Sequence, residues 1–256
     1  MELVDQLSPQ GHESCAVVWL HGMGDTEETW QGILAGSEVA NLGPRDCVWR
    51  HPCAPLGPVT FYGGLRARRW CDTWGDAESV EWVDKPEDVA ESVAFVHQIA
   101  RDLPVPASRI AFGGHSQGGA IALLAALSFP ERLAGCAVFG SWLSHPTSDC
   151  LRKGNWITPC NADLPVWWGH GKQDVIIPFS LQDKHASILD GLLCRQVECH
   201  TYEAMGHFAE AAAVRDMLAW LDARFSGSTT EARATMSSSV PRAVDADISS
   251  AKTFQK

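Results

Sequence analysis

The stretch RIAFGGHSQGGAIALLAAL, residues 109–127, carries the strongest indication of how this chain folds. It begins as an apolar strand, passes through a glycine-rich turn and ends in strong helix formers. Its centre, GHSQG at residues 114–118, matches G-x-S-x-G in the strand–turn–helix context of a nucleophile elbow, which raises a serine above a sheet. We expect a strained backbone at Ser116 and no room for side chains at Gly114 and Gly118. The alternative is a glycine-rich turn without chemistry.

Short apolar runs recur along residues 13–225. They are Cys15–Leu20, Cys47–Arg50, Ile110–Gly113, Cys136–Phe139, Val166–Trp168 and Val197–Tyr202. Several are apolar at every position, which is typical of parallel strands covered on both faces. Segments with helical periodicity lie at Pro86–Leu103, Phe179–Leu193 and Ala209–Phe225. The alternation predicts an open, mostly parallel α/β sheet with helices on both faces and ligands at the carboxyl ends of the strands.

The first of these helices has the signature of a capping box. Asp84 is the expected N-cap, and Glu87 follows it three residues later. The acidic stretch Asp76–Glu87 is otherwise expected to be a loop. In the strand ending at Trp168, the adjacent Trp167 and Trp168 should face opposite sides of the sheet.

The end of the chain differs from the rest in composition. Residues 226–256 are rich in Ser and Thr and contain one aromatic residue, Phe254. Such a segment cannot bury enough apolar surface to offset its ordering entropy. We therefore expect a single folded domain, residues 1–225, followed by a disordered tail, residues 226–256.

The composition of the chain limits the classes of function that it can have. The chain has 256 residues, of which 45% are hydrophobic and 20% charged, as in an ordinary globular protein. Its net charge of −11 disfavours nucleic-acid binding and leaves at most transient contact with membranes. Nine cysteines without a C-x-x-C pair, and a beginning unlike a signal peptide, favour reduced thiols and a cytoplasmic location.

A serine hydroxyl needs a base, and in this kind of fold an acid and then a histidine follow the serine along the chain. His207 is the predicted base, because it lies between the last strand run and the last helix. Its competitors are His145, His170, His185 and His200.

The acid should come from the loop after the preceding strand. Asp174 follows the strand run that contains Trp168, at the end where His207 is expected. Asp163 precedes that strand, and Asp183 falls in a helix. We therefore predict Ser116, Asp174 and His207 as a catalytic triad, in which the carboxylate orients the imidazole.

A second small-residue loop follows the first strand, LHGMGD at residues 20–25. An oxyanion hole in such a fold pairs the backbone N–H after the nucleophile with one from this early loop. We assign these donors to Gln117 and Met23. The alternative for the loop is a simple turn.

Six motifs in the same order make the chain resemble a known family. They are LHGMGDT (residues 20–26), HPCAP (51–55) with PVT (58–60), WCD (70–72), GGHSQGGA (113–120), His170-Gly171 with Asp174 and Pro178, and YEAMGH (202–207). Over residues 15–225 the chain is similar to the acyl-protein thioesterases and their relatives, the small lysophospholipases and carboxylesterases.

The resemblance implies a single-domain α/β-hydrolase fold and a cofactor-free, metal-free serine hydrolase. The family's triad falls on Ser116, Asp174 and His207, and its oxyanion donors fall on Met23 and Gln117. The implied substrates are acyl thioesters and esters, including palmitoyl groups on the cysteines of other proteins. A broad carboxylesterase or lysophospholipase is the alternative, and a catalytically silent binding protein is a further one. The sequence gives no indication of oligomeric state.

Several residues near the predicted site have roles that the resemblance does not settle. His115 stands where relatives commonly carry an aromatic residue. Leu65, Trp70 and Trp142 are candidates to line an acyl-binding groove. A group of three arginines either belongs to a solvated loop or meets an anionic group on a substrate. These arginines are Arg66, Arg68 and Arg69.

Overall fold

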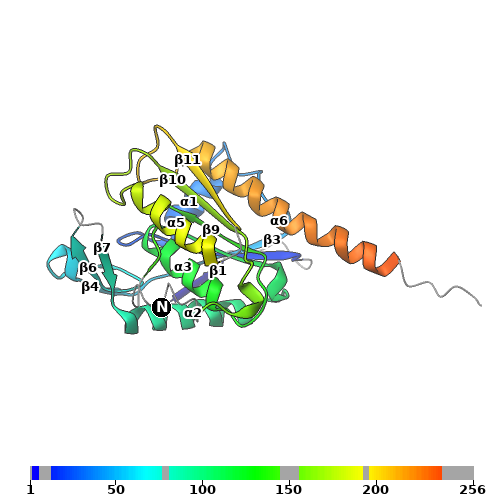
Figure 1. The fold of residues 1–256 in the computed structure, drawn as a ribbon, viewed down its shortest axis with the longest axis horizontal. Coiled ribbons are helices and arrows are strands. Elements are labelled where there is room, and N and C mark those ends of the chain that lie inside the picture. Colours follow the sequence, from blue (N-terminus) through cyan, green and yellow to red (C-terminus); the bar gives the residue numbers. More distant parts are fainter. Residues whose placement is uncertain (1, 6–12, 77–80, 145–155, 193–195, 238–256) are drawn as a thin grey trace, which may run out of the picture.

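The computed structural model describes residues 2–5, 13–76, 81–144, 156–192 and 196–237. Its described strands include a seven-stranded sheet in the order β1-β3-β2-β8-β9-β10-β11 (Figure 1). All neighbours are parallel except β1 with β3. The bounds are β1 Glu2–Asp5, β2 Cys15–Leu20, β3 Cys47–Cys53, β8 Ile110–His115, β9 Gly135–Phe139, β10 Val166–Gly171 and β11 Val197–Tyr202. The predicted α/β architecture is confirmed, and the six predicted strand runs all lie in this sheet.

The described helices are α1 Glu27–Ala35, α2 Pro86–Asp102, α3 Gln117–Ser128, α5 Ser180–Leu192 and α6 Ala211–Ser237. Two hairpins stand apart from the large sheet. They pair β4 Leu56–Val59 with β5 Leu65–Arg68, and β6 Thr73–Asp76 with β7 Glu81–Asp84. Short 3₁₀ turns lie at η1 Thr60–Tyr62, η2 Ala107–Arg109 and η3 Pro159–Asn161.

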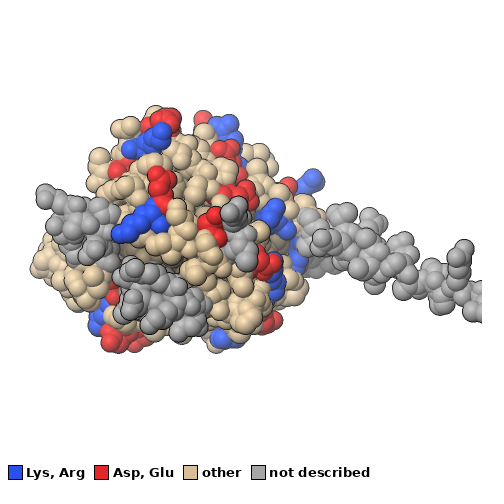
Figure 2. All heavy atoms as spheres, in the orientation of Figure 1, with Lys and Arg blue, Asp and Glu red and all other residues tan. Residues whose placement is uncertain are grey.

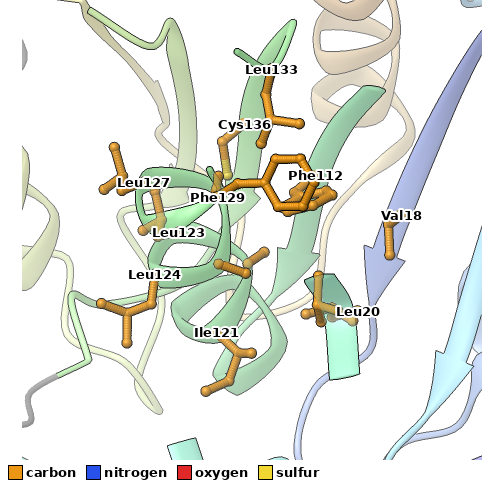
Figure 3. Close-up of a cluster of buried hydrophobic side chains, with 14 of the residues drawn as sticks. Val18, Leu20, Phe112, Ile121, Leu123, Leu124, Leu127, Phe129, Leu133 and Cys136 are labelled. Atoms are coloured by element: carbon orange, nitrogen blue, oxygen red, sulfur yellow. The ribbon is translucent and has the colours of Figure 1, made fainter. Parts of the chain in front are cut away.

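Two hydrophobic cores lie on opposite faces of the sheet. In one, buried side chains of α2, α3 and α5 pack on strand residues such as Val18, Phe112 and Trp168. Figure 3 shows Phe112 and strand residues Val18 and Leu20 beside the apolar side chains of α3. In the other, α1 and α6 pack on the alternate strand residues, including Trp167. The opposite orientation of Trp167 and Trp168 is thus confirmed, and helices on both faces leave the strand ends as the accessible edge.

The prediction for the start of α2 was wrong. The N-cap is Lys85, while Asp84 is the last residue of β7 and is fully buried. Its carboxylate accepts hydrogen bonds from Thr73 Oγ1, Trp142 Nε1 and Ser144 Oγ. Because these buried donors need an acceptor, Asp84 is held in the extended strand and not at the helix end.

The stretch predicted to be a loop, Asp76–Glu87, contains the last residue of β6, all of β7 and the start of α2, and its residues 77–80 lie outside the described residues. Helix α6 was expected to end at Phe225 but continues to Ser237. The good helix formers at residues 231–234 follow the poor formers SGSTT at residues 226–230, so local propensity alone does not account for the continuation. The rest of the predicted tail, residues 238–256, lies outside the described residues.

The surface of the described residues carries charges of both signs. Figure 2 shows acidic and basic side chains of the described residues interspersed on the face in view. Among the described helices none is long and apolar enough to cross a membrane. The seven cysteines in the described residues are free thiols, and one of them, Cys199, is exposed.

Candidate active site

Ser116 occupies the sharp turn between β8 and α3. Its backbone lies at φ 55° and ψ −125°, and residues other than glycine rarely adopt such a positive φ. A Cβ built on Gly114 would lie 2.6 Å from the backbone of Gly118, and one built on Gly118 would lie 2.4 Å from the carbonyl oxygens of Leu20 and His21. The strain at Ser116 and the need for both glycines are therefore confirmed. The elbow holds Ser116 at the rim of the sheet, 8% exposed.

One neighbouring segment, at the end of β9, fixes the peptide groups of Ser116. Its backbone N–H donates to Phe139 O at 2.9 Å, and its carbonyl accepts from Ser141 Oγ at 2.9 Å. Both partners lie at the end of β9, the strand next to β8. The geometry at Ser116 is thus held from outside its own strand and helix, as strained functional positions require.

Asp174 and His207 form a hydrogen-bonded pair. Asp174 lies in the turn after β10, His207 lies in the loop after β11, and Nδ1 of the imidazole is 2.8 Å from Asp174 Oδ2. The other carboxylate oxygen accepts from the backbone N–H groups of Ile176 and Ile177, at 2.9 and 2.8 Å. Because the carboxylate accepts, Nδ1 of His207 carries the proton and Nε2 has a free lone pair.

The charge of Asp174 is stabilised by its hydrogen bonds. Burial raises the pKa of this carboxyl, but hydrogen bonds from His170, His207 and the Ile177 N–H outweigh burial, so the pKa lies well below its ordinary value. Asp174 is therefore ionised at neutral pH and can stabilise an imidazolium on His207.

His170 is a site residue that the sequence analysis named as a competing base and as part of a family motif, without a contact to Asp174. It is fully buried at the end of β10, with Nε2 2.9 Å from Ile177 O and 3.3 Å from Asp174 Oδ2. It therefore contacts the carboxylate oxygen that faces His207, and not the one that accepts from the backbone N–H groups. Its position four residues before Asp174, at the end of the same strand, is the one signal that could have indicated this contact.

The order of the parallel strands brings these segments to one edge. A Cβ built on Gly140, the residue after β9, would lie 3.3 Å from both Asp174 Oδ2 and His207 Nδ1. The next residue is Ser141, which binds the Ser116 carbonyl. The acid–imidazole pair and the elbow therefore flank the same short segment.

His115 connects the elbow directly to the loop of His207. Its Nε2 donates to His207 O at 2.8 Å, and the two ring centroids lie 4.6 Å apart. Burial, followed by the charge of His207, lowers the pKa of His115 to about 4. His115 is consequently neutral at physiological pH and adds no positive charge beside Ser116.

The predicted oxyanion donors lie on either side of Ser116. Gln117 begins α3, where the first N–H groups have no partner within the helix and the dipole is positive. Its buried side chain accepts from Trp70 N at 2.8 Å and donates to Cys71 O and Thr73 Oγ1. On the other side, a Cβ on Gly22, next to Met23, would lie 3.4 Å from Ser116 Cβ.

The candidate groove residues lie in different environments. Leu65 is 72% exposed on β5. Trp70 is buried, and its indole N–H donates to His21 O at 2.8 Å. Trp142 is also buried and packs with Ile177, Leu181 and Ala120. Trp70 therefore packs against the early loop, and only Leu65 of the three presents a large exposed surface.

The three arginines near Leu65 are engaged within the protein. Arg66 and Arg68 donate to the carbonyls of Leu56 and Ala54, at 2.9 Å each. Arg69 pairs with Asp88. These contacts favour a structural role over the binding of an anionic substrate group.

The residues that were the alternative candidates for the base and the acid have other contacts. His200 stacks on Trp167, with centroids 5.0 Å apart, and His185 Nδ1 accepts from Leu143 N at 3.1 Å. Asp163 pairs with Arg132 at the protein surface. His145 lies outside the described residues, and the described residues contain no group of three or more metal-ligating side chains.

The sheet order, the elbow and the helices on both faces define an α/β-hydrolase. The model of the phospholipase/carboxylesterase family matches residues 5–224, and the chain belongs to that family.

Sequence and structural relatives agree with this assignment. A probable inactive carboxylesterase from Oryza sativa is 34% identical over 198 residues, 76% of this chain and 78% of the relative. Acyl-protein thioesterase 1 from Gibberella zeae is 31% identical over 220 residues, 81% of this chain and 89% of the relative. The crystal structure of Zea mays acyl-protein thioesterase 2 has the same fold, with a TM-score of 0.74 at 24% identity, covering 88% of this chain and 98% of that one. The family and these relatives indicate a hydrolase of the carboxylesterase or thioesterase type.

Proposed function

We propose that this protein is a serine hydrolase that cleaves acyl thioesters, with S-palmitoylated proteins as its substrates. The single observation that carries the proposal is the strained Ser116 at a nucleophile elbow, beside a buried Asp174–His207 pair whose Nε2 is free to take a proton. No cofactor is needed, because the proton and the acyl group are both handled by side chains.

The proposed reaction has two halves. Ser116 Oγ attacks the acyl carbonyl as its proton passes to His207 Nε2, and Asp174 stabilises the imidazolium. Backbone N–H groups of Met23 and Gln117 hold the oxyanion. The C–S or C–O bond breaks, His207 returns the proton to the leaving thiol or alcohol, and water repeats the sequence on the acyl-enzyme to release the fatty acid.

Apolar side chains beside the acid and the base favour a lipid substrate. Val175 and Ile176 follow Asp174, and Phe208 follows His207. All three are exposed, Phe208 by 72%. Exposed apolar groups clustered at a reactive site provide a surface for an acyl chain. The names of the thioesterase relatives support a thioester over a small oxyester.

Two alternatives remain specific enough to test. A broad carboxylesterase or a lysophospholipase would use the same chemistry on other leaving groups, in accord with the family description. A catalytically silent binding protein is favoured by one observation: the rice relative is a probable inactive carboxylesterase. We also propose a cytoplasmic location, with which the free thiols of the described residues agree.

A chain-length series separates these functions. Each buried CH₂ contributes about 0.8 kcal/mol, so kcat/KM for p-nitrophenyl esters should climb up to about fourfold per CH₂ in a long-chain enzyme. An S-palmitoyl peptide, run beside its O-palmitoyl counterpart, should be the better substrate. A plateau at short chains would favour the carboxylesterase, and Ser116→Ala gives the background. No turnover with any substrate would support the silent protein.

A further inference from the structure

His21 is a buried histidine that the proposed mechanism does not use. It lies 1% exposed at the start of the loop that carries Met23. Its Nδ1 is 2.7 Å from Gly22 O, and its Nε2 is 3.0 Å from the backbone N of Ala54. A carbonyl oxygen only accepts and a backbone N–H only donates, so Nδ1 carries the proton and Nε2 accepts. Only the neutral Nδ1–H tautomer satisfies both contacts.

The Nδ1 contact controls the direction of a neighbouring N–H. Gly22 C=O and Met23 N–H belong to one planar trans peptide, so they point in opposite directions. Fixing the carbonyl therefore fixes the N–H. Within the described part of the chain, the Met23 N–H donates no hydrogen bond. It is the free donor that an oxyanion site needs.

The peptides on either side are held as well. The carbonyl of His21 accepts from the Trp70 indole at 2.8 Å, and the N–H of Gly24 donates to Arg68 O at 2.7 Å. The middle peptide has the His21 ring and a longer contact, Asp25 N to Gly22 O at 3.2 Å. The imidazole is thus the principal anchor of the peptide that presents the Met23 N–H.

We propose that His21 is a positioning residue for the reaction: its Nδ1–H holds the Gly22–Met23 peptide so that the Met23 N–H faces the oxyanion, and the Ala54 N–H selects the tautomer that does this. The inference rests on the proposed function, because it assigns a task in the same chemistry.

The surroundings of His21 keep it neutral. Burial lowers its pKa, and Arg68 acts in the same direction, while the Gly22 bond and the carboxylates of Asp25 and Glu27 oppose them. His51 is the other titratable group that it faces. Protonation would place an N–H of His21 against the Ala54 N–H, which has no lone pair to accept it.

Two isosteric substitutions separate the ring nitrogens. In His21→Asn the amide nitrogen takes the place of Nδ1 and can still donate to Gly22 O. In His21→Gln the amide oxygen takes the place of Nε2 and satisfies Ala54, but no donor faces Gly22 O. We expect kcat to fall about 10- to 100-fold in His21→Gln and less than about fivefold in His21→Asn, with KM nearly unchanged in both, because an oxyanion donor acts in the transition state.

His97 provides the matched control. Its Nε2 also donates to a backbone carbonyl, Ala125 O at 2.8 Å, but it lies on α2 and packs against Phe129. His97→Leu should lower Tm and leave kcat unchanged. Equal kcat losses in His21→Asn and His21→Gln would overturn the positioning role. So would a kcat loss in His97→Leu as large as that in His21→Gln at a similar fall in Tm.

The tautomer can be read in the wild-type protein, independently of whether the variants fold. A ¹⁵N–¹H spectrum of the imidazole should assign the proton of His21 to Nδ1; a proton on Nε2 would refute the proposal. If the wild type shows no turnover that depends on Ser116, the proposed function fails and the positioning role fails with it. Normal turnover in both the wild type and His21→Gln would overturn the positioning role alone.

Discussion

Replacing Asp174 with asparagine tests the acid–base pair with little change in shape. One carboxylate oxygen accepts from the backbone N–H groups of Ile176 and Ile177, at 2.9 and 2.8 Å. The amide oxygen of the introduced asparagine must take that position, since the amide nitrogen cannot accept. The NH₂ group then faces His207 Nδ1, where Oδ2 now lies at 2.8 Å.

The substitution therefore reverses the tautomer of His207. Nδ1 of His207 must accept from the introduced amide group, so the proton moves to Nε2, which can no longer take the proton of Ser116. We expect kcat to fall about 10⁴-fold, the size of effect that a wrong tautomer produces in a serine triad. Most hydrogen bonds are kept, apart from the contact with His170, so the free energy of unfolding should fall by only about 1–3 kcal/mol.

The assay is saturating hydrolysis of a p-nitrophenyl ester, with urea unfolding of the same preparation. Asp163→Asn is the control, because that carboxylate pairs with Arg132 at the surface before β10 and should leave kcat unchanged. A folded Asp174→Asn variant within tenfold of the wild-type kcat would refute the assignment of Asp174 as the orienting acid.

Three further predictions concern stability. Burial lowers the pKa of His51 to about 4, so between pH 6.5 and 4 the unfolded chain takes up a proton that the native one does not. The free energy of unfolding should lose about 3 kcal/mol from this group as pH falls through that window; His51→Phe should lack this loss in urea titrations at pH 7.5 and 4.5, and an unchanged loss would contradict the assignment. Gly118→Ala, whose Cβ would meet two carbonyl oxygens at 2.4 Å, should cost about 3 kcal/mol or more, whereas Gly32→Ala in open space on α1 should stabilise by about 0.5–1 kcal/mol; equal Tm values would contradict the packing argument. Asp84→Ala removes the carboxylate that accepts from three buried donors, and should lower the unfolding free energy by at least about 3 kcal/mol in denaturant titrations; a loss under about 1 kcal/mol would show that water replaces the carboxylate.

Features with a local chemical cause could be predicted from the sequence. The elbow at Ser116 needs glycines within two residues, and the buried strands need unbroken apolar runs. Both features therefore depend only on residues that are close together in the sequence. Asp174 and His207 follow two strands that are consecutive along the chain. The loops after parallel strands open at the same edge of the sheet, so the sequence suffices to place both residues at that edge.

Features that depend on distant partners could not be predicted. The capping signal at Asp84 was real as a pattern, but three buried donors from two other segments, β6 and the segment after β9, outweighed it. The contact of His170 with Asp174 and the tautomer of His21 depend on distances between groups that only the fold defines. Helix α1 buries little besides Trp30, so its periodicity was too weak to recognise.

Covalent labelling can establish whether Ser116 is the nucleophile, on which the proposed chemistry depends. The wild-type protein would be treated with a fluorophosphonate, digested and mapped by mass spectrometry, with and without a competing S-palmitoyl peptide. We predict a single adduct on Ser116, slowed by the peptide and absent from Ser116→Ala. An adduct on another residue, or no adduct on a folded wild-type protein, would show that Ser116 is not the reactive group.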